Sequence, residues 1–243
     1  MEIVLILGAT SDIGEAIAYH FASKGHPVYL AARNPEALTS IRSDLEIRFQ
    51  IEVRIFQFDA NLFATHSQFW QQLPRTPEIT ICVFGYLGEQ NRAQLEWEET
   101  EKIINANYIG AVSLLNPVAN QYEENKQGTI IGISSVAGER GRQSNYIYGS
   151  AKAAFTAYLS GLRNRLAKSG VHVATINPGF VDTKMTEGLP LPKPLTAQPK
   201  QVATAVYKAY RHKKNVTYSL WMWRWIMIII KMIPERIFKK MKL

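Results

Sequence analysis

The stretch "LILGATSDIG" (residues 5–14) passes from an apolar run into a glycine-containing turn. The run predicts a buried strand that ends at Gly8, and the residues after the turn predict a helix from about residue 13 to residue 24. A strand, a glycine turn and a helix in this order bind a dinucleotide pyrophosphate, because the helix N-terminus offers free N–H groups and a positive dipole end. The alternative is a purely structural turn. We expect Gly8 and Gly14 to belong to a nucleotide site.

Strands and helices alternate along the chain, and the predicted strands are continuous apolar runs, typical of a parallel sheet covered on both faces. They lie at 3–7, 27–32, 52–58, 80–85, 128–135, 171–179 and 215–219. The predicted helices lie at 13–24, 35–45, 97–122, 148–167 and 201–213. Four prolines in residues 189–200 exclude a helix or a central strand and predict a substrate-side loop. We therefore predict an α/β Rossmann-type fold, a doubly wound parallel sheet in three α/β/α layers, forming one domain over residues 1–219.

The end of the second predicted strand indicates which nicotinamide cofactor the chain binds. NAD(H) sites carry an acid there for the ribose 2′-hydroxyl, but this chain has no acid in residues 31–34. Arg33 is suited to a 2′-phosphate, since a guanidinium pairs well with phosphate oxygens. We expect NADP(H) rather than NAD(H), with an ordinary surface arginine as the alternative. Asp59, after the third strand, is placed to meet the adenine edge or else to cap its own loop.

Tyr148 and Lys152 lie four residues apart at the start of a predicted helix, so both side chains share one helix face. A free tyrosine has a pKa of about 10 and is a poor acid–base catalyst at neutral pH. We expect the nearby ammonium to lower the pKa of Tyr148, so that it can protonate a carbonyl oxygen while hydride reaches the carbon. Ser134 and Ser135 end the fifth strand, where a serine hydroxyl can hold the same oxygen.

Five stretches, "GATSDIG", "NANYIG", "ISSVAG", "YGSAK" and "NPGFVDT", resemble the motifs of the short-chain dehydrogenase/reductase family. The resemblance covers residues 1–218 and implies a seven-stranded doubly wound sheet. It implies a catalytic tetrad of Asn107, Ser135, Tyr148 and Lys152, in which Asn107 holds a water that relays protons to Lys152. Ser135 is preferred to Ser134 because it lies thirteen residues before Tyr148, and Tyr146 is excluded because position 150 is a serine.

The resemblance also implies the cofactor contacts. With the residues above, the expected set is Gly8, Thr10, Ser11, Ile13, Gly14, Arg33, Asp59, Gly85, Tyr148, Lys152, Pro178, Gly179, Val181 and Thr183. Two departures stand out. Asp12 replaces the middle glycine of the first turn, and we expect its carboxylate to turn away from the pyrophosphate and cap the helix. "FGYLG" (84–88) replaces the usual Asn-Asn-Ala-Gly, which leaves the glycines but removes the asparagine contacts.

The formal net charge of +8 is concentrated at the C-terminal end. Residues 211–243 contain nine basic residues and one acidic residue, and residues 1–210 contain 19 of each. A nucleic-acid surface would spread the charge more evenly, so we expect no nucleic-acid partner. The charge favours an anionic membrane surface as the partner of this end.

Residues 220–243 are both basic and rich in tryptophan. The apolar run from Leu220 to Ile230 has 11 residues and includes Arg224; as a helix it spans roughly 17 Å, too little for a hydrocarbon core of about 30 Å. We expect residues 220–243 to lie at a membrane interface, with residues 235–243 as an interfacial helix. Packing on the chain's own domain or on another subunit is the alternative.

A membrane-associated reductase is expected to act on a lipophilic or lipid-linked carbonyl. "FGYLG" and the C-terminal segment resemble the membrane-associated, decaprenylphosphoryl 2-keto-ribose reductase-like members of the family, which implies a polyprenyl-phosphate keto sugar. Long-chain 3-keto lipid reductases, steroid or retinoid reductases and a non-catalytic NADPH-binding membrane scaffold are the alternatives. The family also implies a homodimer or homotetramer through the two long helices.

The N-terminus and the cysteine content complete the expectations. Residues 1–8 do not resemble a signal peptide, so we expect a cytoplasmic protein that is peripheral on the cytoplasmic face of a membrane. Cys82 is the only cysteine and lies in an apolar run, which predicts a buried structural thiol. The sequence indicates no metal site.

Overall fold

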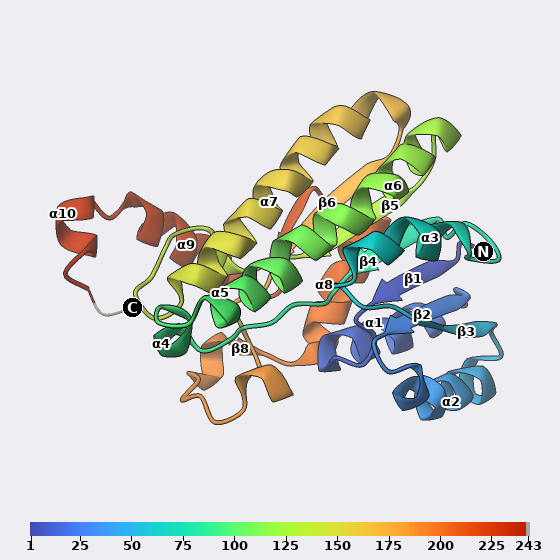
Figure 1. Cartoon of the computed structure of the whole chain (residues 1–243), viewed down its shortest axis with the longest axis horizontal. Helices are drawn as coiled ribbons and strands as arrows, with labels where there is room; N and C mark the ends of the chain where they lie inside the picture. Colours follow the sequence, from blue (N-terminus) through green and yellow to red (C-terminus); the bar gives the residue numbers. More distant parts are fainter. Residues whose placement is uncertain (242–243) are drawn as a thin grey trace.

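A parallel sheet of seven strands forms the middle layer of the molecule in this computed structural model, which describes residues 1–241 (Figure 1). The strand order is β3-β2-β1-β4-β5-β6-β9, and all the neighbouring strands are parallel. The strands are β1 (Val4–Leu7), β2 (Val28–Ala32), β3 (Val53–Gln57), β4 (Ile79–Cys82), β5 (Thr129–Ile133), β6 (His172–Asn177) and β9 (Val216–Tyr218). The predicted doubly wound α/β/α fold is therefore confirmed.

Helices cover both faces of the sheet. One face carries α1 (Asp12–Ala22), α2 (Thr39–Phe49) and α8 (Pro199–Arg211), and the other carries α3 (His66–Gln71), α6 (Gly110–Asn125) and α7 (Tyr146–Leu166). Strand β1 shows why its sequence is continuously apolar: Val4 and Ile6 enter one core, whereas Leu5 and Leu7 enter the other. Cys82 is buried in the second core, as predicted.

The strand order reverses direction beside β1, and this places the site. Leu7 of β1 is in register with Cys82 of β4, so the turn after β1 lies next to the loop after β4. Ligands of open α/β sheets bind at the carboxyl ends of the strands near such a switch point. The turn at Gly8 and the loop 84–88 therefore lie side by side at the carboxyl edge of the sheet.

The long helix predicted over 97–122 is divided. It consists of α5 (Trp97–Ile104), a π-helical turn η3 (Asn105–Ile109) and α6. The backbone widens at η3, where Gly110 donates to the Asn105 carbonyl. Single π-helical turns inside α-helices often occur at functional sites, and this one contains Asn107.

Several short elements escape the sequence patterns, because they have too few residues to show a period. They are the 3₁₀ turns η1 (Pro35–Leu38), η2 (Phe63–Thr65), η4 (Val136–Gly138), η5 (Ala167–Ser169), η6 (Lys184–Thr186) and η7 (Lys193–Leu195), helix α4 (Gln90–Ala93), and a two-stranded sheet of β7 (Phe180–Val181) and β8 (Thr196–Ala197). The proline-rich segment 189–200 thus contains an edge strand. Helix α8 begins inside it, with Pro199 at the first helical position, where the missing N–H costs nothing.

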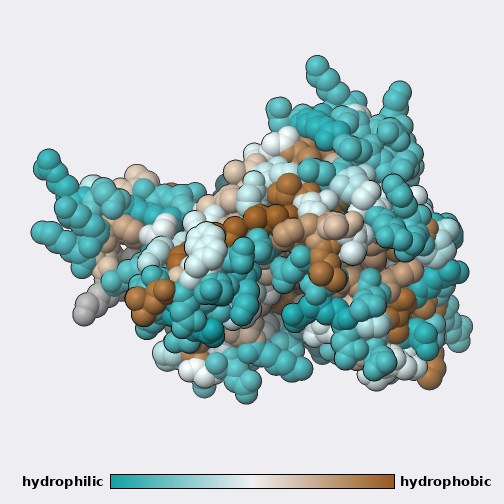
Figure 2. Space-filling view, in the orientation of Figure 1, coloured by the Kyte–Doolittle hydropathy of each residue, from teal (hydrophilic) through white to brown (hydrophobic). Residues whose placement is uncertain are grey.

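The C-terminal segment, residues 220–241, contains α9 (Met222–Met232) and α10 (Glu235–Phe238). It projects from the body at the end of the molecule far from the N-terminus (Figure 1). Figure 2 shows hydrophilic side chains over its outer end, where α10 lies in Figure 1. Residues 242 and 243 of the helix expected over 235–243 lie outside the described residues. Within residues 1–241, no helix combines the length and apolar character that crossing a membrane requires.

Candidate active site

Tyr148 and Lys152 lie on one side of the first turns of α7, as their spacing predicted. The Lys152 Nζ atom is 5.8 Å from the centre of the Tyr148 ring. Lys152 is 4% exposed, and its ammonium donates a 3.1 Å hydrogen bond to the Ile133 carbonyl at the end of β5. Burial lowers the pKa of Lys152 to about 8, so the group is still mainly charged at neutral pH.

The phenol of Tyr148 is hydrogen-bonded to the side chain of Ser135. Burial is the larger influence on this phenol and raises its pKa to about 12, while the hydrogen bond with Ser135 acts in the opposite direction. The expected lowering of the pKa of Tyr148 by Lys152 is therefore not found in this structure. The reason is physical: desolvation of a buried phenol disfavours its charged form.

The two serines at the end of β5 have different surroundings. The Ser134 hydroxyl donates to the Lys152 carbonyl at 3.1 Å and lies 2.6 Å from the Thr156 hydroxyl, so it joins β5 to α7. Ser135 accepts from the Ala137 amide at 3.1 Å and faces Tyr148. This arrangement supports the choice of Ser135. Tyr146 is exposed and points to Gln94, away from this cluster.

Asn107 is fully enclosed at the π-helical turn. Its amide donates to the carbonyls of Ile103 and Tyr86 at 2.8 and 2.6 Å, and its side-chain oxygen accepts from the Tyr86 amide at 3.3 Å. A Cβ atom on Gly85 would lie 2.7 Å from this oxygen and 3.3 Å from the Lys152 Nζ atom. Asn107 therefore holds residues 85 and 86 directly beside Lys152. The water relay through Asn107 stays a prediction.

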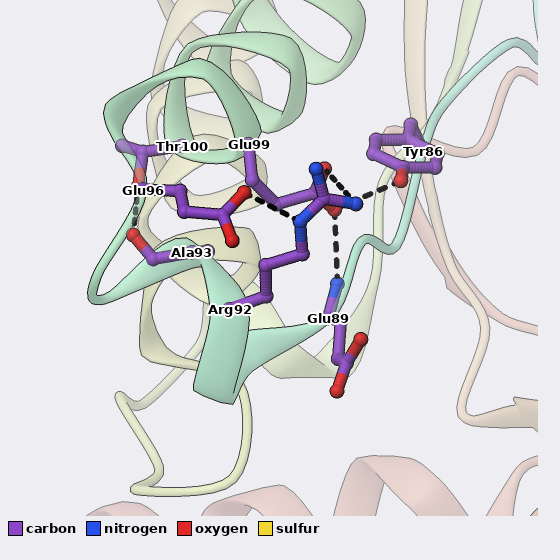
Figure 3. Close-up of polar contacts among 7 residues, drawn as sticks. All are labelled: Tyr86, Glu89, Arg92, Ala93, Glu96, Glu99 and Thr100. Carbon is purple, nitrogen blue, oxygen red and sulfur yellow. Dashed lines mark hydrogen bonds and ion pairs between the residues drawn. The ribbon is translucent and has the colours of Figure 1, made fainter.

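Glu99 of α5 holds the other side of the loop 84–88 (Figure 3). Its Oε1 atom accepts from the Tyr86 hydroxyl at 2.8 Å and from the Glu89 amide at 3.2 Å. The hydrogen bond from Tyr86 keeps the pKa of the buried Glu99 carboxyl below its usual value. Arg92 reaches Glu96 at 2.6 Å and lies 4.0 Å from Glu99. In place of the missing asparagines, a tyrosine and a buried glutamate fix this loop.

A cleft of about 420 Å³ opens at the carboxyl edge of the sheet. Eight of the expected cofactor residues line it: Gly8, Thr10, Ser11, Ile13, Arg33, Asp59, Gly85 and Thr183. Lining residues that the sequence analysis did not assign include Phe84, Tyr86, Lys102 and Met185. Phe84 and Tyr86 follow β4 directly, so the rule that ligands bind at strand ends was the available signal. Nothing in the sequence distinguishes Lys102 from other helix-surface lysines.

Arg33 and Asp59 follow the neighbouring strands β2 and β3 and line the cleft with different bonding. Arg33 is exposed, and within residues 1–241 its guanidinium has no hydrogen bond or ion pair. The Asp59 carboxylate accepts from the Asn61 amide at 2.9 Å, so Asp59 caps its own loop while lining the cleft. The start of α1 and the unpaired guanidinium fit a dinucleotide that carries an additional phosphate.

The other expected cofactor residues lie outside the cleft lining. Gly14 is buried in α1 next to the Gly8 carbonyl, and Tyr148 and Lys152 lie in the cluster described above. The Pro178 carbonyl accepts from the Val136 amide at 3.0 Å. Val181 is buried in β7, and Gly179 is in contact with Trp223 of α9.

Asp12 does not cap α1, so that expectation is wrong. Ser11 is the N-cap, because its hydroxyl accepts from the Gly14 amide at 3.1 Å. The Asp12 carboxylate instead accepts from the Lys184 amide at 2.8 Å. Since both residues line the cleft, this bond links the turn after β1 to the segment after β7.

Residues 2–193 match the family model described as short chain dehydrogenase. The chain is 35% identical over 241 residues to the protein named "uncharacterized oxidoreductase Rv2073c" of Mycobacterium tuberculosis, which covers 98% of this chain and 96% of that protein. It is 31% identical to "uncharacterized oxidoreductase in mprA 5'region" of Streptomyces coelicolor. That alignment covers 98% of this chain and 95% of the Streptomyces protein. A solved structure of similar fold, "Short-chain dehydrogenase from Sphingobium yanoikuyae in complex with NADPH", has a TM-score of 0.84 and 24% identity and covers 97% of each chain.

Proposed function

We propose that this chain, which belongs to the short-chain dehydrogenase family, is an NADP(H)-dependent oxidoreductase that reduces a ketone or oxidises a secondary alcohol. The observation that carries the proposal is the cluster of partly buried Ser135 and Tyr148 with buried Lys152 at the carboxyl edge of the sheet. A structural role would not require an ammonium to be buried beside a phenol, because the ammonium loses solvation.

The cleft between the turn after β1 and the loop after β4 suits NADP(H). The first turn of α1 would face the pyrophosphate, and Arg33 would pair with the 2′-phosphate. The absence of an acid in residues 31–34 disfavours NAD(H). The similar Sphingobium yanoikuyae structure is a complex with NADPH, which agrees with this choice.

The bound cofactor would supply the hydride for ketone reduction. Tyr148 would give its phenolic proton to the carbonyl oxygen, and the Ser135 hydroxyl would hold the same oxygen. A phenol with a pKa raised to about 12 is kept in the proton-bearing form that this step needs. The Lys152 ammonium would stabilise the phenolate that remains, since an opposite charge nearby favours an ionised group.

Oxidation of NADPH with a panel of aliphatic, aromatic and alicyclic ketones tests the activity. We expect turnover with at least one ketone and a higher kcat/KM for NADPH than for NADH. A chain that binds NADPH but turns over no ketone and no secondary alcohol would support the alternative of a non-catalytic scaffold. Equal kcat/KM for both cofactors would contradict the role of Arg33.

For the substrate we propose a lipophilic or lipid-linked ketone, such as a polyprenyl-phosphate keto sugar, reached at an anionic membrane surface. The support is the outer face of the C-terminal segment. Trp221, Trp225, Ile229 and Met232 recur at helical spacing along α9 and are exposed. Such an apolar stripe beside clustered basic residues is typical of interfacial helices. Long-chain 3-keto lipids, steroids and retinoids belong to the same lipophilic class.

The basic residues favour a bilayer over a protein as the partner of this stripe. Arg224, Arg236, Lys239 and Lys240 are exposed on the same segment, and Glu235 is its one acid. Each lysine or arginine near an anionic surface contributes about 1 kcal/mol to attraction. Flotation with vesicles of anionic lipid tests the proposal: we expect binding that salt weakens. Absence of binding at low salt would contradict it.

We further propose a homodimer or homotetramer that packs through residues 97–122 and 148–167. The support is that α6 and α7 lie side by side on the outer face of the sheet (Figure 1). Sedimentation equilibrium measures the mass of the assembly. A monomer at all concentrations would contradict this part of the proposal without affecting the reaction.

A further inference from the structure

Helix α9 contacts three segments that border the catalytic edge of the sheet. Its buried residues Trp223 and Met227 form a small core with Val136, one residue after Ser135. Phe180 of β7 and Leu195 of η7 pack against the same core. One helix therefore touches the segment after the catalytic serine, the turn at Gly179 and the proline-rich loop.

Trp223 makes the closest of these contacts. Its ring fills the place where a Cβ atom on Gly179 would be, with ring atoms 1.9 Å from that position. Its indole N–H donates to the Leu195 carbonyl at 3.0 Å, and its ring meets the ring of Phe180 at 5.4 Å in an edge-on arrangement. A shift of Trp223 would release two of the three segments at once.

Arg140 fastens the C-terminal end of α9 to the loop that follows Ser135. Its guanidinium donates to the carbonyls of Ile230 and Ile233 at 2.5 and 2.7 Å and to the Lys231 carbonyl at 3.2 Å. It also pairs with Glu235 at 3.1 Å and lies 3.7 Å from the centre of the Phe238 ring. A cation at a helix C-terminus meets the negative end of the dipole and satisfies carbonyls that lack a helical partner.

The neighbouring Glu139 adds a second attachment. Its carboxylate pairs with Lys231 of α9 at 2.7 Å and accepts from the Asn177 amide at 3.4 Å. It also hydrogen-bonds Tyr218 of β9. The Glu139 side chain is 9% exposed and the Lys231 side chain 47%, so the ion pair lies at the surface while Glu139 joins α9 to the ends of β6 and β9.

From these contacts we propose that Arg140 is a positioning residue of the active site. It holds α9 against the loop 135–140, and α9 in turn holds Ser135, Gly179 and the proline-rich loop in their working arrangement. This inference rests on the proposed oxidoreductase function. The buried side of α9, with Trp223 and Met227, would support the active site. The exposed side, with Trp221 and Trp225, is the proposed membrane surface.

Replacement of Arg140 by alanine tests the inference in the full chain. We expect kcat for ketone reduction to fall about 10- to 100-fold, because small misplacements of catalytic groups have effects of this size. The Kd of NADPH should change less than about twofold, because Arg140 does not line the cleft. Arg140→Lys, which keeps the charge but not the planar fork, should recover part of kcat. The matched control is Arg75→Ala, which removes one exposed arginine outside the cleft and the C-terminal segment and breaks no hydrogen bond or ion pair within residues 1–241.

Hydrogen exchange of the α9 amides gives a readout that needs no turnover. Arg140→Ala should speed exchange in α9 and leave the strands protected. Arg75→Ala should leave exchange in α9 unchanged. Phe238→Ala, a milder change at the same attachment, should act in the same direction if Arg140→Ala does not fold. Unchanged exchange would show that Arg140 does not hold the helix. Faster exchange with unchanged kcat would show that the helix does not position the site. If the wild-type chain has no activity, the proposed function fails, while exchange still decides whether Arg140 holds α9.

Discussion

The Lys152 ammonium lies beside the Tyr148 ring, 5.8 Å from its centre, yet its hydrogen bond goes to the Ile133 carbonyl at 3.1 Å. The ammonium therefore lies near the Tyr148 ring and shares no hydrogen bond with the Tyr148 phenol. Tyr148 has its hydrogen bond with Ser135 instead. The proposed mechanism gives proton donation to Tyr148 and charge stabilisation to Lys152, so each role can be removed separately.

Tyr148→Phe removes the proposed proton donor and keeps the ring. We expect kcat for ketone reduction to fall about 10²- to 10⁴-fold, the range for a lost general acid. NADPH binding and thermal stability should be nearly unchanged. The control is Tyr146→Phe, at an exposed tyrosine of the same helix turn, which should keep full activity. Full turnover by Tyr148→Phe would refute the mechanism.

The pH dependence of ketone reduction should follow Lys152. Burial lowers the pKa of Lys152 from 10.5 to about 8, so its positive charge is present below that value and is lost above it. We expect kcat to be constant at lower pH and to fall as pH rises through about 8. Lys152→Met should be slow at every pH and lack this decline. A wild-type rate that is unchanged about two units above pH 8 would contradict the role of the ammonium.

Arg33→Ala should weaken NADPH but not NADH. Hydrogen bonds to charged groups contribute roughly 1.5–3 kcal/mol, so we expect the Kd of NADPH to rise about 10- to 100-fold. The Kd of NADH, which lacks the 2′-phosphate, should change little. Titrations of both cofactors measure this difference. Arg75→Ala, at an exposed arginine outside the cleft lining, is the control for charge alone. An equal loss for both cofactors would contradict 2′-phosphate pairing.

Replacement of Trp221 and Trp225 by serine should weaken binding to anionic vesicles at least about tenfold, since each buried aromatic side chain contributes on the order of 1.5–3 kcal/mol. These side chains are 73% and 56% exposed and face away from the body. Trp97→Ser, at a 66% exposed tryptophan on α5, is the matched control and should bind as the wild type does. Flotation measures all three proteins. Equal loss in the control would show that the outer face of α9 is not the contact.

His172 should make folding sensitive to acid. Burial lowers the pKa of His172 from 6.5 to about 4, with the nearby Lys213 as a further cause. Below pH 6.5 the unfolded chain binds a proton at His172 that the folded chain does not bind. The contribution of His172 to the free energy of unfolding is therefore complete above pH 6.5 and is lost as pH falls toward 4. The loss is on the order of 2–3 kcal/mol. His172→Gln should reduce the acid dependence of the free energy of unfolding in urea. His212→Gln, at an exposed histidine, should not.

Local patterns were enough for the sheet and for eight of the residues that line the cleft. Apolar runs mark the five central strands β2, β1, β4, β5 and β6, because a strand buried on both faces is mainly apolar. The edge strands β3 and β9 are partly exposed and carry polar residues. The spacing of Tyr148 and Lys152 required only helix geometry. Arg33 was found because it follows β2, where the sheet edge holds the ribose.

Other features needed contacts between distant segments. Asp12 looked like a helix cap, but Ser11 takes that role and Asp12 bonds to Lys184, which lies 172 positions away. Glu99 resembles any acidic residue of a helix until the loop 84–88 folds over it. The pKa of Tyr148 also depended on burial, which no local pattern predicts.

Residues only a few positions apart in the sequence were enough to locate most strands and helices, the nucleotide turn and the pairing of Tyr148 with Lys152. The tertiary structure alone decided how the C-terminal helix lies. Helix α9 is apolar on two sides, so its composition cannot tell which side packs on the body. Arg140 and Glu139 decide this by binding its C-terminal end, which turns Trp223 toward Gly179 and leaves Trp221 and Trp225 outside.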